Sequence, residues 1–208
     1  MLRLAIFFFV FVTAASVQAQ TITADLDGKL VELKNRFIQP VKNPSIGQTK
    51  YIAFYCGAGW CGPCHRFTPE LVKFYNEMKP NYPNFEVVFL SDDRSPVEMQ
   101  NYMAEMSMPW PAVRWDAVKW SKGAKLCGSG IPCLVVIDQN DQVVSNSYEG
   151  QKYIGPYKVI DDLRNLLTQG GTTVAAANMP ASSAAPPRSA TPPSPSGTNW
   201  NEVFKKKP

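Results

Sequence analysis

Apolar residues gather in three compact runs in the middle of the chain, and turn-forming residues bound each run. The runs are Tyr51–Cys56, Phe85–Leu90 and Leu134–Ile137. Short continuous apolar runs are typical of strands that are buried on both faces of a sheet. Gln142–Ser145 follows a polar turn at 138–141 and is expected to form a fourth strand, in a hairpin with the third.

Helical spacing of apolar residues marks the segments between and after these strands. Cys64–Met78 and Tyr157–Leu167 each carry apolar residues three or four positions apart, which predicts amphipathic helices. Ser95–Met106 is also predicted to be helical, with Pro96 in its first turn. Ala24–Val41 has room for a short hairpin or strand. The alternation predicts an α/β fold whose first strand–helix–strand unit is a right-handed βαβ.

The N-terminal end has the pattern of a secretory signal peptide at residues 1–19. Arg3 precedes an apolar run from Leu4 to Val12, and Val17-Gln18-Ala19 fits a small-x-small cleavage site. The run is too short to span a bilayer comfortably. We therefore expect an exported protein, either periplasmic or secreted, with disulfides that can persist.

The C-terminal end changes composition after Gly170. Residues 20–170 are expected to form the folded domain. Residues 171–198 are rich in alanine, proline and serine, which predicts a disordered linker, because such a segment cannot bury enough apolar surface to fold. Residues 199–208 carry two aromatic residues and three lysines, which suggests a docking peptide for a partner, a contact with an anionic membrane surface or a solvated terminus.

The charge of the chain lies mostly at its ends. The chain has 21 basic and 17 acidic residues, of which 16 of each remain once the two end segments are set aside. The residues set aside are Arg3, Arg188, Lys205, Lys206, Lys207 and Glu202. The predicted domain is therefore neutral and lacks the basic face that nucleic-acid binding requires.

The sequence Trp60-Cys61-Gly62-Pro63-Cys64 carries the clearest chemistry, because it lies between a predicted strand and a predicted helix. A thiolate is the nucleophile in disulfide exchange, and the positive end of a helix dipole lowers the pKa of a cysteine at that helix start. The two-residue spacer lets Cys61 and Cys64 form a disulfide. Pro63 restricts the backbone of the first turn, and Trp60 shapes the surface around Cys61.

These residues resemble the thioredoxin superfamily, and in particular its tryparedoxin/nucleoredoxin branch. The resemblance extends over roughly 26–167 and rests on four segments: Tyr51–Pro69, Phe85–Ser95, Met108-Pro109-Trp110 and Gly130-Ile131-Pro132. It implies a thioredoxin fold, with a central mixed β-sheet flanked by helices. It also implies that Cys61 attacks a disulfide and that Cys64 resolves the mixed disulfide. Pro132 would be cis, and the backbone of Ile131 would bind a substrate chain.

The sequence departs from the pattern of the superfamily near Cys64. Tyr55 stands where thioredoxins often have a buried aspartate, and Ser91-Asp92-Asp93 replaces a lysine after the next strand. A water molecule or one of the nearby carboxylates would then handle the proton of Cys64.

Other interpretations of the cysteines remain open at the level of the sequence. Cys61-Gly62-Pro63-Cys64-His65 also fits the CxxCH pattern of c-type haem attachment, and a zinc site or a purely structural Cys61–Cys64 disulfide are further alternatives. Cys133 is interpreted as a small buried apolar residue, with a Cys127–Cys133 disulfide as the alternative, and Cys56 as a buried structural residue.

The sequence as a whole predicts a thiol–disulfide oxidoreductase, without cofactor or metal, that acts as a reductant on exported proteins or small-molecule thiols. The alternative is a thioredoxin-like binding module that docks a partner through its C-terminal tail. A reductant of this kind needs a membrane or soluble electron donor, and no nucleic-acid partner is expected.

Overall fold

The structure is a computed structural model that describes residues 21–41 and 45–170. The chain divides into residues 1–171 and 172–208, and the second unit lies outside the described residues. The predicted signal peptide, the linker and the C-terminal segment also lie outside them. In the part that is described, no helix has both the length and the apolar character needed to cross a bilayer.

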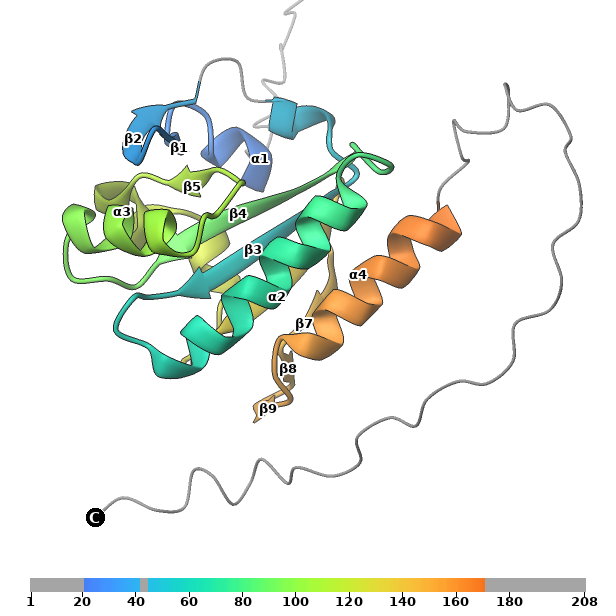
Figure 1. Cartoon of the computed structure of the whole chain (residues 1–208). Coiled ribbons are helices and arrows are strands. Elements are labelled where there is room, and N and C mark those ends of the chain that lie inside the picture. The colour runs from blue at the N-terminus through green and yellow to red at the C-terminus, as the bar shows by residue number, and fades with distance from the viewer. Residues whose placement is uncertain (1–20, 42–44, 171–208) are drawn as a thin grey trace, which may run out of the picture. The chain divides into compact units, whose positions relative to one another are not determined.

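Seven strands form one mixed sheet in the order β2-β1-β5-β4-β3-β6-β7 (Figure 1). They are β1 Leu30–Lys34, β2 Phe37–Pro40, β3 Tyr51–Gly57, β4 Phe85–Ser91, β5 Ala112–Val113, β6 Cys133–Asp138 and β7 Val143–Asn146. A separate two-stranded hairpin consists of β8 Tyr148–Glu149 and β9 Lys152–Tyr153.

Four α-helices and three short 3₁₀ helices complete the domain. The α-helices are α1 Ile22–Asp25, α2 Gly62–Met78, α3 Pro96–Glu105 and α4 Tyr157–Gly170. The 3₁₀ helices are η1 Ser45–Gln48, η2 Trp115–Trp120 and η3 Gly123–Leu126.

Strand β3 lies in the interior of the sheet, between β4 and β6, and all seven of its residues are buried. It pairs in parallel with β4 and antiparallel with β6. Helix α2 connects β3 to β4, and α3 connects β4 to β5, which is parallel to β4. Both connections step in the same direction across the sheet, so right-handed crossovers place both helices on one face.

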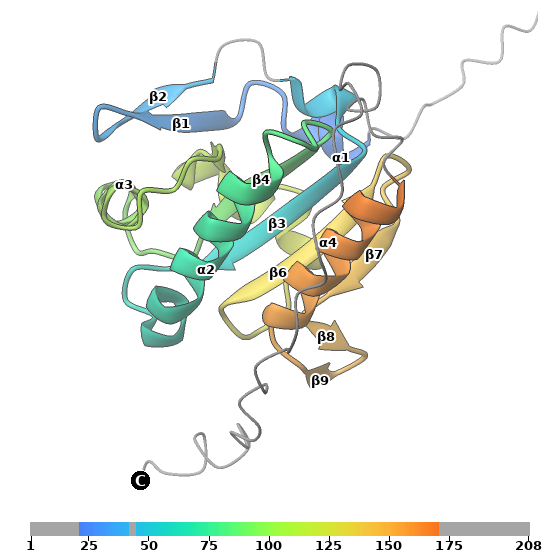
Figure 2. The same ribbon diagram turned by 45° about the vertical axis from the view of Figure 1, so that its right-hand side comes forward.

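The two faces of the sheet have separate hydrophobic clusters. The buried residues of α2, α3 and α4 belong to one cluster, and those of α1, η2 and η3 pack with the other. Figure 1 shows α2 and α4 side by side across the first face. Figures 1 and 2 agree that the β8–β9 hairpin lies at the end of the sheet where α2 begins.

The α/β architecture with a mixed central sheet is confirmed, and the predicted central strands and helices differ from the observed ones by only a few residues. Residues 24–41 hold the second half of α1 and the β1–β2 hairpin, whose two-residue turn Asn35-Arg36 has positive φ at both positions. That is the turn geometry that matches the twist of paired strands. β5 was not predicted, because two residues are too few for a periodic pattern.

Candidate functional site

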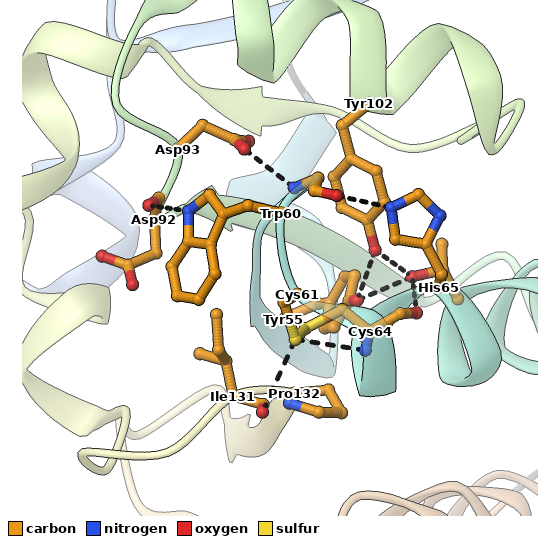
Figure 3. The surroundings of a disulfide bond; sticks show 12 residues. Tyr55, Trp60, Cys61, Cys64, His65, Asp92, Asp93, Tyr102, Ile131 and Pro132 are labelled. Atoms are coloured by element: carbon orange, nitrogen blue, oxygen red, sulfur yellow. Dashed lines mark hydrogen bonds between the residues drawn. A yellow bond between two sulfur atoms is a disulfide. The ribbon is translucent and has the colours of Figure 1, made fainter.

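The Cys61–Cys64 pair lies where β3 ends and α2 begins, and its sulfurs form a disulfide (Figure 3). The Cα atoms are 5.2 Å apart. Cys61 is the N-cap of α2, and its Sγ accepts the N–H of Cys64 at 3.2 Å. Pro63 lies in the first helical turn, where it costs no helical hydrogen bond. After reduction, this N–H and the helix dipole would stabilise a thiolate on Cys61.

The two sulfurs differ in their access to solvent. Cys61 is 5% exposed, whereas Cys64 is 0% exposed. Of the two cysteines, only Cys61 therefore has any exposed surface that a substrate could approach.

Trp60 forms one wall beside the disulfide. Its side chain is 53% exposed, and its indole N–H donates to the carbonyl oxygen of Asp92 at 3.1 Å (Figure 3). This hydrogen bond fixes the orientation of a large apolar surface next to Cys61.

The loop that contains Ile131 and Pro132 forms the opposite wall. The Ile131–Pro132 bond is cis, as the resemblance implied. The carbonyl oxygen of Ile131 lies 3.7 Å from Sγ of Cys61 (Figure 3). The structure therefore brings the Cys61–Cys64 motif and the Ile131–Pro132 loop together, although Cys61 and Ile131 are 70 residues apart.

The turn before Cys61 is held from two sides. Asp93 accepts the N–H of Gly59 at 2.8 Å and the hydroxyl of Ser91 at 2.7 Å. His65 Nε2 forms a hydrogen bond with the carbonyl oxygen of Gly59 at 2.5 Å. Burial raises the pKa of Asp93, and its hydrogen bonds offset part of this effect.

A cluster of three buried hydroxyl groups lies on the inner side of Cys64. The Thr68 hydroxyl donates to the carbonyl oxygen of Cys64 at 2.8 Å. Its oxygen is 2.6 Å from both the Tyr55 and the Tyr102 hydroxyl oxygens, which are 3.1 Å apart. Burial raises the pKa of both tyrosines, so the cluster stays neutral. Tyr55 thus replaces the expected aspartate with an uncharged network.

The role of Thr68 and Tyr102 in this cluster was missed at the level of the sequence. Each fits the apolar face of its own helix, and nothing in the periodicity indicates that two helices and a strand bring their hydroxyls together. Tyr55 alone carried a signal, because it departs from the pattern of the superfamily.

The remaining cysteines form one further disulfide. Cys56 is buried, as predicted, and it is bonded to Cys127, a pairing that the sequence left open. Cys133 is free and buried, which confirms its interpretation as a small buried residue, and the alternative Cys127–Cys133 disulfide is not present. The Cα atom of Cys133 pairs with that of Cys56 across β3 and β6. Periodicity could not have revealed the pairing of Cys56 with a loop residue.

The described residues contain no group of three or more histidine, cysteine, aspartate or glutamate side chains that could hold a metal ion. His65 lies on the first turn of α2, where its Nδ1 is 3.7 Å from a carboxylate oxygen of Glu105.

Comparisons with known proteins agree with this geometry. The sequence model of a thioredoxin-like family matches residues 48–143. Human nucleoredoxin is 37% identical over 109 residues, which are 51% of this chain and 24% of that protein. Probable nucleoredoxin 1 of Arabidopsis thaliana is 39% identical over 103 residues, 49% of this chain and 17% of that protein. The chain thus spans a quarter or less of the length of these two relatives.

Among solved structures, a mutant tryparedoxin-I is 30% identical, with a TM-score of 0.50. The match extends over 60% of this chain and 85% of that one. The thioredoxin fold expected from the sequence is therefore confirmed.

The predicted localisation is wrong. The curated relatives are nucleoredoxins, which are intracellular proteins of the cytosol and nucleus and are not exported. The prediction rested on Arg3, the apolar run at residues 4–12 and the cleavage pattern Val17-Gln18-Ala19. A run of that length is not specific, because buried or interfacial segments can have it too. Exported substrates and a periplasmic setting are withdrawn with it.

Taken together, the mixed sheet, the disulfide at the start of α2 and these relatives show that the chain belongs to the thioredoxin superfamily, in its nucleoredoxin/tryparedoxin-like branch.

Proposed function

We propose that the chain reduces disulfides of proteins or small-molecule thiols through the Cys61/Cys64 dithiol. The observation that carries the proposal is the asymmetry of the pair. Cys61 keeps a small exposed surface at a helix N-terminus, and Cys64 is fully buried. Such a pair has one attacking and one resolving sulfur.

The exchange runs in two steps, each of which forms one S–S bond and breaks another. The thiolate of Cys61 attacks one sulfur of the substrate disulfide, and the other substrate sulfur leaves and takes up a proton. Cys64 then loses its proton and attacks Sγ of Cys61. This closes the Cys61–Cys64 disulfide and releases the second substrate thiol. A dithiol or reductase must return two electrons and two protons to the pair.

The surroundings of the pair support separate roles for its neighbours. The N–H of Cys64 and the dipole of α2 lower the pKa that the reduced Cys61 would have. Trp60 limits access from one side. The Thr68 hydroxyl binds the backbone of Cys64, and the hydroxyls of Tyr55 and Tyr102 bind Thr68. Because this cluster is neutral, the proton of Cys64 passes to water or to a carboxylate outside it.

The direction of electron flow is proposed from the motif itself. Gly62-Pro63 between the two cysteines resembles the low-potential members of the superfamily, which act as reductants. The alternative of a pure binding module rests on residues 199–208, which lie outside the described residues, so no structural observation favours it.

Turnover of insulin disulfides with dithiothreitol as electron donor tests the proposal. We expect Cys61→Ser to abolish catalysis, and Cys64→Ser to accumulate a mixed disulfide that mass spectrometry detects. Cys133→Ser is the matched control, since it removes a buried thiol outside the pair. Unchanged turnover in Cys61→Ser would show that the dithiol is not the reacting group.

A further inference from the structure

Two tyrosines of the β8–β9 hairpin hold the loop that carries Pro132. The Tyr148 hydroxyl accepts the N–H of Gly130 at 2.7 Å, and the Tyr153 hydroxyl donates to the carbonyl oxygen of Pro132 at 2.7 Å. The two rings pack edge to face, with centroids 5.1 Å apart. One small hairpin therefore contacts the loop on both sides of Ile131.

The Tyr148 ring also lies directly on the backbone of this loop. A Cβ atom added to Gly128 would come within 2.1 Å of the ring, and one added to Gly130 within 2.9 Å of the hydroxyl oxygen. Such distances are far inside van der Waals contact. The glycines at 128 and 130 are thus what allows the hairpin to sit against the loop.

The geometry of the hairpin places the Tyr148 and Tyr153 side chains next to each other. Tyr148 pairs with Tyr153 across its two strands, and Gly150 has a φ of 61° in the two-residue turn between them. Positive φ in such a turn matches the twist of a tight hairpin. The two hydroxyls are therefore fixed relative to each other before they reach the loop.

These contacts leave both backbone groups of Ile131 unoccupied by the hairpin. Gly130 N–H and Pro132 C=O are both occupied by tyrosine hydroxyls, and Pro132 has no N–H. Within the described ranges, the N–H of Ile131 donates to no protein group, and its carbonyl oxygen faces Sγ of Cys61 at 3.7 Å. A peptide that lies extended beside the dithiol would meet one donor and one acceptor here.

We propose that Tyr148 and Tyr153 are positioning residues that aim the backbone of Ile131 at the main chain of a peptide or protein disulfide. This inference rests on the proposed function and names its preferred substrate class. A disulfide without a peptide backbone has no groups to pair with Ile131, so it gains nothing from the two tyrosines.

Comparison of two substrates tests the inference. Insulin supplies a disulfide within peptide chains, and bis(2-hydroxyethyl) disulfide supplies one without a backbone. In Tyr153→Phe and in Tyr148→Phe, loss of one hydrogen bond to the loop is expected to raise KM for insulin about fivefold. The kcat/KM for the small disulfide and the reduction potential of the Cys61–Cys64 pair should stay at the wild-type values.

Tyr82→Phe is the matched control, because it removes a tyrosine hydroxyl beyond the other end of α2. Thermal melting identifies any variant that fails to fold, and Tyr148→Phe and Tyr153→Phe provide independent tests. Equal losses on both substrates, or no loss on insulin, would overturn the inference. Absence of turnover on both substrates in the wild-type protein would instead refute the proposed function.

Discussion

The Thr68 hydroxyl donates to the carbonyl oxygen of Cys64 at 2.8 Å, one helical turn along α2. The same oxygen lies within hydrogen-bond distance of two buried tyrosine hydroxyls, Tyr55 from β3 and Tyr102 from α3. A single side chain thus connects the resolving cysteine to the central strand and to a second helix. The buried surroundings of Cys64 are polar without being charged.

Thr68→Val is expected to destabilise the domain by about 1–3 kcal/mol, because it leaves two buried tyrosine hydroxyls without their shared partner. Urea denaturation of the reduced and the oxidised protein measures this loss. Thr168→Val is the control, since Thr168 makes the same bond to the carbonyl oxygen four residues earlier, on the exposed side of α4. A similar small effect in both variants would mean that the buried cluster contributes little.

Asp93→Asn is expected to change how the free energy of unfolding depends on pH. Burial raises the pKa of Asp93 in the folded protein, so the folded state holds this proton more tightly than the unfolded state. The stabilisation that protonated Asp93 gives the fold is fully present below the pKa that Asp93 has in the unfolded state. It is lost as pH rises through the pKa that Asp93 has in the folded state. Asparagine does not ionise, so the variant should gain stability relative to the wild type near neutral pH, and the gain should shrink in acid.

Chemical denaturation from pH 3 to pH 8 measures the difference in the free energy of unfolding between the wild type and Asp93→Asn. Asp92→Asn is the matched control, because Asp92 is the exposed neighbour of Asp93. A pH-independent difference between wild type and Asp93→Asn would contradict the assignment of the titration to this carboxyl group.

The central strands and the helices followed from the sequence because their patterns are local. Seven buried residues in a row and apolar spacing along α2 and α4 need no knowledge of the rest of the chain. The dithiol was equally visible, since its chemistry depends on a spacing of three residues at a strand–helix junction.

What the sequence did not reveal depends on contacts between distant segments. Cys56 and Cys127 are 71 residues apart. The β8 and β9 strands have two residues each, too few to show a period, although they carry Tyr148 and Tyr153 to the cis-proline loop. The buried hydroxyl cluster likewise draws one residue from each of three elements. Such features follow from topology and were not predictable from periodicity.

Cys127→Ser is expected to lower the stability of the oxidised protein by about 4 kcal/mol, from the loop-closure entropy of a crosslink between residues 71 apart. Denaturation of the wild type and the variant under oxidising conditions measures this. When both proteins are fully reduced, the difference should nearly vanish, because neither has the crosslink. A difference that persists after full reduction would assign the loss to packing of Cys127 and not to its disulfide.

Cys61 and Cys133 are expected to differ strongly in alkylation of the reduced, folded protein. Cys61 is the N-cap of α2 and keeps a small exposed surface, and the helix N-terminus should let its thiolate form below the pH of an ordinary thiol. Cys133 is buried, and burial raises its pKa. Iodoacetamide should therefore modify Cys61 within minutes at neutral pH and leave Cys133 unmodified.

Denaturant should expose Cys133 and bring its rate of alkylation to that of a free thiol, which would show that the fold protects it. Rapid modification of Cys133 in the native protein would mean that β6 opens readily beside the cis-proline loop. The description of this loop as a fixed wall opposite Trp60 would then be wrong.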